Sequence, residues 1–287
     1  MKISKTILSL RNEITLWRKQ GLTIAFVPTM GHLHAGHIEL VNAARKKCDK
    51  VVVSIFVNPL QFNETADFSA YPKTLVQDQD KLTDAQTDML YLPDVEEMYP
   101  VSQESITKVI VPEIGSELEG AFRPGHFDGV STVVLKLFNQ VMPDIAFFGE
   151  KDFQQLLLVK KMVNDLNVSI EIQSVATQRE ADGLAMSSRN TRLTPAQRAI
   201  APELFGVLNE LAEQLKKGDA DIKMLEGQAL KRLKLAGFEP EYISVRNALN
   251  LLPADDNTGH RVVLGAARLG EVRLIDNLSI DQVAPVR

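Results

Sequence analysis

The sequence has a single cysteine and lacks any long apolar run, and these two scarcities exclude several classes of protein. Cys48 has no partner for an internal disulfide, as is typical of proteins kept in a reducing cytoplasm. The longest strongly apolar run, at 51–57, is far too short to span a bilayer. Arg11 and Glu13 interrupt the apolar stretch that a signal peptide requires. We therefore expect a cytoplasmic protein that is neither secreted nor embedded in a membrane.

Excess positive charge is also missing. Lysine and arginine total 32 against 37 aspartates and glutamates, so the net charge is -5. Such a balance gives no general attraction to nucleic acid or to an anionic membrane. The basic cluster at 45–50 is expected to be the solvated last turn of a helix. The 287 residues are 45% hydrophobic and 24% charged, which indicates a soluble globular protein of one large or two moderate domains.

The first two thirds of the chain alternate between strand and helix patterns. Short apolar runs predict buried strands at 22–27, 51–57, 88–92, 106–111, 144–149 and 168–175. Helical periodicity predicts helices at about 7–17, 36–47, 72–82, 128–141 and 151–166. This alternation predicts an α/β fold with a parallel sheet covered on both faces. Ligands bind such sheets at the carboxyl ends of the strands.

The last third has a different pattern. Two helical stretches come first and are followed by shorter strand candidates at 241–246, 261–268 and 271–275. The two helical stretches lie at 194–216 and 221–236. We therefore predict two domains, a larger one over 1–180 and a smaller α+β one over 181–287.

The stretch "PTMGHLHAGHIEL" (28–40) holds three of the chain's five histidines just after a predicted strand. Gly31 and Gly36 have the spacing of a phosphate-binding P-loop, but His37 stands where that motif requires lysine. A helix that begins here would still offer free N–H groups and a dipole that suits an anion. His34 and His37 would lie on the same side of its first turn and could donate to phosphate oxygens.

Two alternatives compete with the anion-binding interpretation. The histidines could be polar surface residues of a turn. That interpretation would be the better one for a single histidine, but it explains a group of three less well. His34 and His37 could instead bind a metal, but no carboxylate or cysteine nearby has the spacing of a third ligand.

Two further strand ends carry polar residues. "SIFVNPLQF" (54–62) ends a strand and presents Gln61, a neutral amide between apolar neighbours that could recognise a hydroxyl or carboxylate. "FFGEKDFQQL" (147–156) places Lys151 at a strand-to-helix turn, with Gln155 one turn further on the same face. The alternatives are an ordinary loop for Gln61 and a capped surface helix for Lys151.

Two loops complete the candidates. "ADGLAMSSRNTRLT" (181–194) combines small residues with Ser187, Ser188 and Arg189, a composition suited to a polyphosphate-binding loop or to an interdomain linker. "RPGHFDGV" (123–130) is a turn before a helix and is expected to border the same site.

These segments together resemble the pantothenate synthetase (pantoate–β-alanine ligase) family. His34 to His37 resembles the HIGH signature of the nucleotidylyltransferase superfamily, and "MSSRN" (186–190) resembles the KMSKS-type loop. "PTMGHLHAGH", "VNPLQF", "RPGHFDGV", "GEKDFQQL" and "DGLAMSSRN" occur in the family's order over nearly the whole chain. The resemblance implies a Rossmann-like N-terminal domain, a smaller C-terminal lid domain and a homodimer.

The resemblance also implies a reaction. It implies condensation of (R)-pantoate with β-alanine to give pantothenate, a coenzyme A precursor, with ATP cleaved to AMP and pyrophosphate in the presence of Mg²⁺. The intermediate would be a non-covalent pantoyl adenylate. The partners would be small molecules and a second copy of the chain, without nucleic acid or membrane.

Matching motif positions imply residue roles. Catalytic roles fall to His34, His37, Lys151 and Arg189, and Gln61 and Gln155 would bind pantoate and β-alanine. ATP would be held by Met30, Gly31, His32, Leu33, His34, Ala35, Gly36, His37, Gly149, Glu150, Lys151, Asp152, Gln178, Met186, Ser187, Ser188 and Arg189. The metal ligands stay unassigned, with Asp78 and Asp80 as candidates.

Two other functions remain open on the sequence. A related HIGH-type enzyme could move AMP onto a phosphorylated cofactor precursor, although such an acceptor would call for extra cationic residues rather than two glutamines. The second possible function is that of a non-catalytic module that binds nucleotide or RNA. The net negative charge of the chain argues against binding of RNA.

Overall fold

A computed structural model describes residues 1–63, 68, 71–101, 105–217, 221–255 and 258–281. The chain forms two compact units. The N-terminal unit comprises Met1–Glu150 and Gln155–Ala176, and the C-terminal unit comprises Lys151–Gln154 and Thr177–Arg287.

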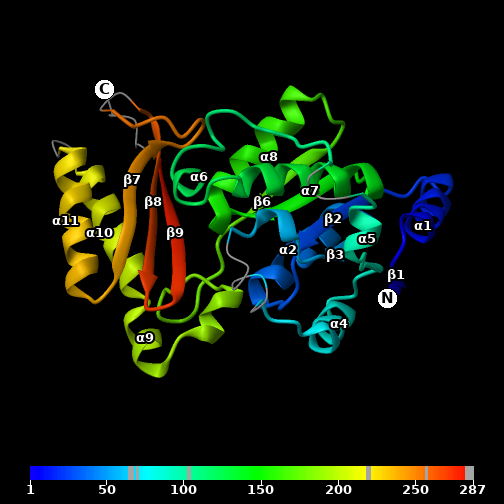
Figure 1. The fold of residues 1–287 in the computed structure, drawn as a ribbon, viewed down its shortest axis with the longest axis horizontal. Helices are drawn as coiled ribbons and strands as arrows, with labels where there is room; N and C mark the ends of the chain where they lie inside the picture. The colour runs from blue at the N-terminus through cyan, green and yellow to red at the C-terminus, as the bar shows by residue number, and fades with distance from the viewer. Residues whose placement is uncertain (64–67, 69–70, 102–104, 218–220, 256–257, 282–287) are drawn as a thin grey trace. The chain divides into compact units, whose positions relative to one another are not determined.

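The N-terminal unit is built on a six-stranded sheet with the order β1-β4-β3-β2-β5-β6. Its neighbouring strands pair in parallel, as the alternating sequence pattern predicts (Figure 1). The strands are β1 (Lys2–Ser4), β2 (Ile24–Thr29), β3 (Lys50–Ile55), β4 (Met89–Tyr91), β5 (Ile145–Gly149) and β6 (Glu171–Val175). The predicted α/β, Rossmann-like class is confirmed, although the sequence pattern does not predict β1.

Helices cover both faces of this sheet because successive residues of a buried strand point to opposite sides. Val27 of β2 belongs to one apolar cluster with Val41 of α2, whereas Phe26 packs edge-on against Phe138 of α7, with ring centroids 6.4 Å apart. The helices are α1 (Ile7–Lys19), α2 (Ala35–Lys47), α4 (Leu75–Asp84), α5 (Val95–Met98), α6 (Glu119–Phe122), α7 (His126–Val141) and α8 (Phe153–Asp165), with 3₁₀ turns η1 (Pro59–Gln61) and η2 (Glu150–Asp152).

The strand predicted at 106–111 does not form. The segment lies along α7, where the N–H of Val109 donates to Thr132 Oγ1 at 2.9 Å and its carbonyl accepts from Ser131. Hydroxyls of a helix thus satisfy backbone groups that a strand would pair in a ladder. The apolar alternation of the segment reflects partial burial, and the prediction of a strand is wrong.

Two predicted helix limits also differ from the structure. The helix predicted from 72 begins at Leu75, and the stretch 194–216 is two helices, α9 (Pro195–Ile200) and α10 (Glu203–Lys216). Pro202 lies between α9 and α10, where its missing N–H and fixed φ disfavour a continuous helix.

The C-terminal unit pairs helices with a three-stranded antiparallel sheet of order β7-β8-β9 (Figure 1). Its strands are β7 (Glu239–Asn247), β8 (His260–Leu269) and β9 (Val272–Asp281), and α10 and α11 (Ile222–Leu235) share its core. A Cβ on Gly265 of β8 would lie 2.7 Å from Ile243 Cδ1, so the missing side chain makes room for this packing. The predicted α+β character is observed.

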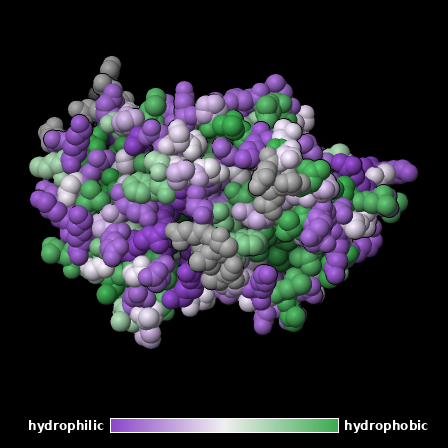
Figure 2. All heavy atoms as spheres, viewed as in Figure 1, coloured by the Kyte–Doolittle hydropathy of each residue, from purple (hydrophilic) through white to green (hydrophobic). Residues whose placement is uncertain are grey.

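The visible surface mixes hydrophilic and hydrophobic side chains (Figure 2). Isolated apolar residues such as Leu8 and Leu235 are exposed, which is ordinary for a folded protein. Within the described ranges, none of the helices combines the length and apolar character needed to cross a membrane.

The segment from Met30 to His37, called here the histidine loop, connects β2 to α2 and has an unusual backbone. Gly31 and His32 have φ values of 82° and 50°, a left-handed conformation that few non-glycine residues adopt. The buried carboxylate of Asp78 on α4 accepts from the N–H of His32 and of Leu33, each at 2.8 Å. Two consecutive backbone donors are thereby fixed by one side chain of a neighbouring helix.

Other side chains of the same region support the histidine loop. Thr74, beside α4, donates to Asp78 at 3.2 Å, and Lys81 donates to the carbonyl of Leu33 at 2.6 Å. A Cβ on Gly31 would lie 3.0 Å from Ile55 and 3.2 Å from Asp78, so glycine suits both the conformation and the space. Side chains on and beside α4 therefore help to hold the histidine loop in place.

We expect Asp78→Asn to loosen the histidine loop. The amide nitrogen cannot accept a hydrogen bond, so one buried N–H loses its partner at a cost of about 1–3 kcal/mol. Thermal unfolding should begin at a lower temperature, and the amides of His32 and Leu33 should exchange faster with solvent.

Asp80→Asn is the matched control because Asp80 lies on the same helix with an exposed side chain. It should change stability by less than about 0.5 kcal/mol. Equal effects of the two substitutions would contradict an anchoring role for Asp78.

Candidate active site

His34 and His37 cap the helix that they begin. His34 is the N-cap of α2, and its Nδ1 accepts from the N–H of Gly36 at 3.2 Å. The Nδ1 of His37 accepts from the N–H of His34 at 3.2 Å, so the two form a reciprocal capping box made of histidines. Their ring centroids are 4.0 Å apart. The pair is therefore a compact group of two imidazoles at the end of β2.

This capping fixes the tautomer of both rings. A neutral imidazole accepts at one nitrogen and donates at the other, and Nδ1 is the acceptor in His34 and His37. The ring proton of each neutral histidine therefore lies on Nε2. The backbone contacts set the orientation of both rings, and an imidazole N–H of this kind is a group that can bind a phosphate oxygen.

One part of the predicted anion site is different in the structure. The first-turn N–H groups were expected to be available to an anion, but that of Gly36 is bound by His34 Nδ1 and that of His37 by the carbonyl of His34. Two N–H groups of the first turn are therefore already hydrogen-bonded within the histidine loop.

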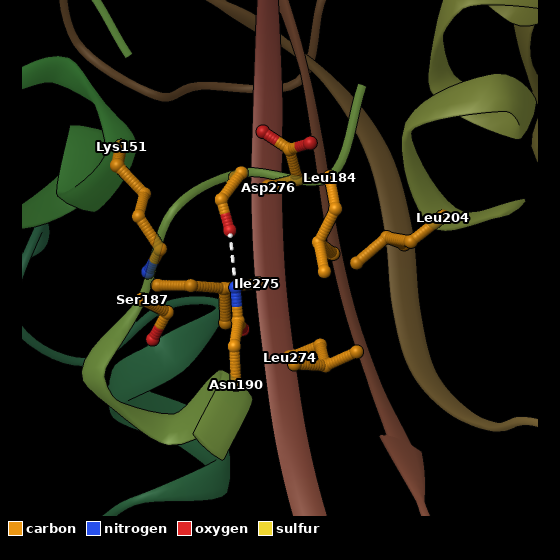
Figure 3. A pocket seen from close by; sticks show the side chains of 9 residues that line it. Lys151, Leu184, Ser187, Asn190, Leu204, Leu274, Ile275 and Asp276 are labelled. Atoms are coloured by element: carbon orange, nitrogen blue, oxygen red, sulfur yellow. Dashed lines mark hydrogen bonds between the residues drawn. The ribbon is translucent and has the colours of Figure 1, made fainter. Parts of the chain in front are cut away.

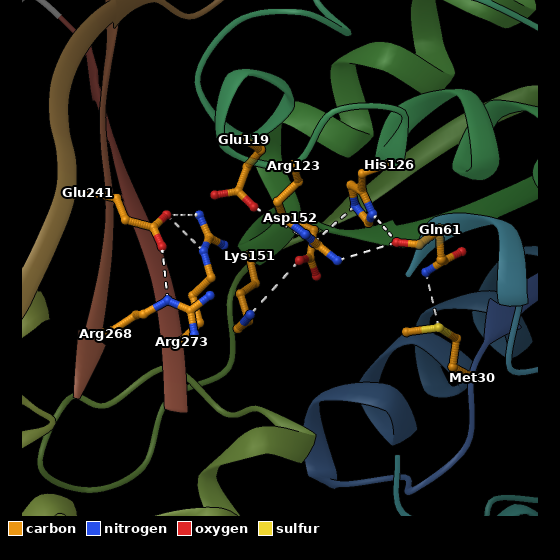
Figure 4. A network of polar contacts seen from close by, with 10 residues as sticks. All are labelled: Met30, Gln61, Glu119, Arg123, His126, Lys151, Asp152, Glu241, Arg268 and Arg273. Atoms are coloured by element: carbon orange, nitrogen blue, oxygen red, sulfur yellow. Dashed lines mark hydrogen bonds and ion pairs between the residues drawn. The ribbon is translucent and has the colours of Figure 1, made fainter. Parts of the chain in front are cut away.

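Gln61 lies in a buried polar group at the end of β3. Its Oε1 accepts from Asn58 Nδ2 at 3.0 Å, and its Nε2 lies 3.1 Å from the sulfur of Met30 in the histidine loop (Figure 4). Asn58 is 1% exposed, and its Oδ1 accepts from the hydroxyl of Tyr99 at 2.8 Å. The structure thus brings Gln61 next to the histidine loop, as the sequence predicted for neighbouring strand ends.

Asn58 has a structural role that the sequence pattern does not predict. Its Nδ2 also donates to the carbonyl of Gly129 on α7, at 3.1 Å. A Cβ on Gly129 would lie 2.4 Å from the carbonyl oxygen of Leu60, so α7 touches the turn that carries Gln61. One feature of the sequence could have identified Asn58 as a structural residue. It is an amide side chain that directly follows a buried strand and precedes a proline.

The segment 123–130 borders Gln61, as expected. His126 Nδ1 lies 2.7 Å from the carbonyl oxygen of Gln61, and Arg123 Nη2 donates to the same oxygen at 3.4 Å (Figure 4). Glu119 pairs with Arg123 at 3.9 Å. This side of the group therefore combines a guanidinium, an imidazole and a carboxylate around one buried carbonyl.

The charged residues of the turn after β5 contact different partners. Glu150 accepts from Ser174 Oγ on β6 at 2.8 Å, whereas Lys151 Nζ lies 3.9 Å from the carboxylate of Asp152 (Figure 4). The side chain of Lys151 is 19% exposed. Gln155 follows in α8, half-buried. Lys151 therefore forms an ion pair with Asp152, its neighbour in the turn.

The predicted phosphate loop at 181–194 contains a short 3₁₀ helix, η3 (Ser188–Arg192). Ser187 caps it by accepting from the N–H of Arg189 at 3.2 Å, and the N–H of Met186 donates to the carbonyl of Gln178 at 2.9 Å. Gln178 is therefore tied by its backbone to the start of this segment.

A pocket in the C-terminal unit is lined by residues of that loop (Figure 3). Lys151, Ser187, Asn190 and Asp276 supply its polar groups, and Leu184 and Leu274 are among its apolar ones. Asn190 Nδ2 donates to the carbonyl of Ala185 at 3.0 Å, which leaves its buried Oδ1 without a hydrogen-bond partner in the described residues. An ammonium, a hydroxyl and an unused acceptor thus gather within one unit.

Charges on the sheet of the C-terminal unit are paired separately. Glu241 of β7 pairs with Arg273 at 2.7 Å and with Arg268 at 3.5 Å (Figure 4). Both ion pairs connect different strands of the sheet, and each gives an arginine of the sheet a carboxylate partner.

The described residues contain no cluster of three His, Cys, Asp or Glu side chains that could hold a metal ion. Both oxygens of the candidate Asp78 already accept backbone hydrogen bonds, and Asp80 is exposed. Neither residue therefore forms a ready-made metal site.

The sequence matches a known family over almost its full length. The family model for pantoate-beta-alanine ligase matches residues 2–279. A pantothenate synthetase of Stutzerimonas stutzeri (strain A1501) is 51% identical over 98% of both chains. A pantothenate synthetase of Aeromonas hydrophila is 53% identical over 94% of both chains.

Solved structures of the same kind resemble the fold. Pantothenate synthetase from Thermus thermophilus has a TM-score of 0.88 at 42% identity, covering 97% of this chain and 99% of that one. Pantoate-beta-alanine ligase from Francisella tularensis, complexed with beta-gamma ATP and beta-alanine, has a TM-score of 0.80 at 35% identity, covering 97% of both chains. With this sequence match and the histidine loop at the end of β2, the chain belongs to the pantoate-beta-alanine ligase family.

Proposed function

We propose that this protein condenses (R)-pantoate with β-alanine to form pantothenate, and that it cleaves ATP to AMP and pyrophosphate to do so. The family membership supports this reaction. The observation that carries the mechanism is the histidine capping box, which sets two imidazoles side by side at the start of α2, with ring centroids 4.0 Å apart.

In the first step, a carboxylate oxygen of pantoate attacks the α-phosphorus of ATP, and the bond to the bridging oxygen of pyrophosphate breaks. Both reactants are anionic, so catalysis must offset their repulsion and the charge that grows on pyrophosphate. We assign this role to the donors of His34 and His37 and to the cations of Lys151 and Arg189. His37 acts by stabilising charge.

In the second step, the uncharged amine of β-alanine attacks the acyl carbon of pantoyl adenylate. AMP leaves as the carbon–oxygen bond breaks, and the amine loses a proton. Water competes with the amine for the same carbon, so the site must hold the adenylate and exclude solvent. Gln61 and Gln155 are proposed to hold the pantoyl group, and Gln61 also faces the β-alanine position.

Residue roles in nucleotide binding follow the motif positions. We propose that ATP is bound by the histidine loop, by the turn from Gly149 to Asp152, and by the segment from Met186 to Arg189, with Gln178 near the adenine. The region 1–180 would bind nucleotide and pantoate, and the region 181–287 would act as a lid. A cytoplasmic homodimer is the form proposed for the assembly.

Mg²⁺ is proposed to arrive with ATP. In nucleotide sites this ion usually keeps several waters and is held by phosphate oxygens with one or two carboxylates, so a ready-made protein cage is not needed. A Mg²⁺ ion held in this way needs no cluster of three protein ligands, and the described residues contain none. When bound, the ion would neutralise charge on the leaving pyrophosphate.

The chemistry of the side chains favours a non-covalent intermediate. An acyl-enzyme needs an activated nucleophile. Burial raises the pKa of the Cys48 thiol above its ordinary value, which disfavours the thiolate, and Cys48 is at the far end of α2 from the capping box. Ser187 uses its oxygen to cap η3.

An assay of products tests the reaction. Purified protein with ATP, Mg²⁺, pantoate and β-alanine should form AMP and pantothenate in equal amounts. If this mixture gives no pantothenate, and a second mixture with a phosphorylated acceptor in place of pantoate and β-alanine transfers AMP to that acceptor, the protein is the related adenylyltransferase. Nucleotide binding with no AMP released under any of these conditions would indicate a binding module.

We expect Lys151→Ala to lower kcat by roughly a hundred- to a thousandfold while the fold survives. The charge of Lys151 matters more as pyrophosphate leaves than when ATP first binds, so the loss should exceed any loss of ATP affinity. Lys160→Ala on the exposed face of α8 is the control and should keep full activity. A folded Lys151→Ala variant with normal kcat would remove Lys151 from the mechanism.

We expect Gln61→Ala and Gln155→Ala to weaken pantoate binding by about 1–3 kcal/mol, because each leaves a polar group of the ligand unpaired. ATP binding, measured by calorimetry on the same samples, should change far less. The exposed Gln20 at the end of α1 offers a control substitution. Equal losses of ATP and pantoate affinity would argue against this assignment.

A further inference from the structure

Strand β9 carries two polar residues in a buried position. Asp276 and Asn277 are only 4% and 6% exposed, and Leu274 and Ile280 of the same strand belong to the core of the C-terminal unit. The guanidinium of Arg179 meets the Asp276 carboxylate with two bonds, of 2.6 and 3.0 Å. A bidentate ion pair is thus built into a strand whose pattern would otherwise call for apolar side chains.

Arg179 also closes the turn that precedes the phosphate loop. It donates to the carbonyl of Gly183 at 3.1 Å and to that of Asn277 at 3.3 Å, and its Cζ lies 3.8 Å from the ring centroid of Phe205. Its backbone forms a bridge with Ala185. The position of Met186 to Arg189 therefore depends on a side chain that is anchored in β9.

Asn277 holds a second segment from the adjacent position of the same strand. Its Nδ2 donates to the carbonyl oxygen of Lys151 at 2.9 Å, and its N–H donates to Asp276 Oδ1 at 2.8 Å. Lys151, Ser187 and Asp276 line the same pocket (Figure 3). One dipeptide of β9 is thereby connected to both the Lys151 turn and the Ser187 loop.

The energetics of a buried pair suggest that stability is not its main contribution. Taking two charges out of water is costly, and well-packed apolar residues in place of such a pair are often equally stable or more stable. A bidentate ion pair has a directional geometry. It is therefore well suited to holding two functional segments at a fixed distance and orientation.

We propose that Arg179, Asp276 and Asn277 are positioning residues, which hold the Lys151 turn and the Ser187–Arg189 segment in the relation that binding of the ATP phosphates requires. The proposal rests on the proposed function, because it assigns a purpose to these contacts in that reaction. None of the three residues needs to touch the substrate. Their effect passes through Lys151 and the phosphate loop.

A double substitution separates positioning from stability. Arg179→Met with Asp276→Leu replaces the pair by apolar side chains and leaves no single buried charge. We expect this variant to unfold at a temperature near that of the parent, yet to lose about a hundredfold in kcat, since a small misplacement of catalytic groups has an effect of that order. The KM for pantoate should stay unchanged. A folded double variant with normal kcat would overturn the proposal.

Asn277→Ala gives a second test that does not alter the ion pair. It removes the hydrogen bond to Lys151, so kcat should fall and the peptide spanning 150–156 should exchange its amide hydrogens faster. Asn247→Ala is the matched control, because Asn247 also makes a side-chain bond to backbone, at Leu249. Equal behaviour of the two variants would overturn the proposal even if the double variant failed to fold.

The same assay separates this proposal from the function on which it rests. If the parent protein forms no pantothenate, the proposed function fails. If the parent is active and the Asn277→Ala and double variants are equally active, only the positioning role fails.

Discussion

The hydrogen bonds from the histidine loop to Asp78 are the interaction on which the rest of the site depends. His32 has a left-handed conformation that is costly for a residue other than glycine, and one buried carboxylate holds the N–H groups of His32 and Leu33. The chain then enters α2 with His34 at the N-cap, and the reciprocal capping with His37 orients both imidazoles. The tautomers that make Nε2 a donor follow from this backbone geometry.

Each unit of the chain uses buried polar residues to place residues that carry charge or donate hydrogen bonds. In the N-terminal unit, Asp78 fixes the histidine loop and Asn58 fixes the amide of Gln61. In the C-terminal unit, Asp276 and Asn277 hold Arg179 and the backbone of Lys151. Buried polar groups are costly unless fully paired, so their presence at these points agrees with a requirement for fixed geometry.

Local sequence predicted much of this arrangement. The apolar runs located β2 and β3 correctly, and the strand-end rule placed the histidine loop and Gln61 together. The anchoring by Asp78 could not be predicted, because Asp78 lies 45 residues beyond Leu33 and periodicity carries no information on such a contact. The strand predicted at 106–111 is wrong for a related reason, since hydroxyls of α7 rather than a neighbouring strand pair with Val109.

The central claim is that the oriented histidines serve adenylyl transfer to pantoate without a covalent enzyme intermediate. Exchange of labelled pyrophosphate into ATP measures this step directly. With pantoate, ATP and Mg²⁺ but no β-alanine, exchange should be rapid, and Cys48→Ala should leave it almost unchanged. Exchange that appears only when β-alanine is added, or pantoyl label that stays attached to the denatured protein, would contradict the account.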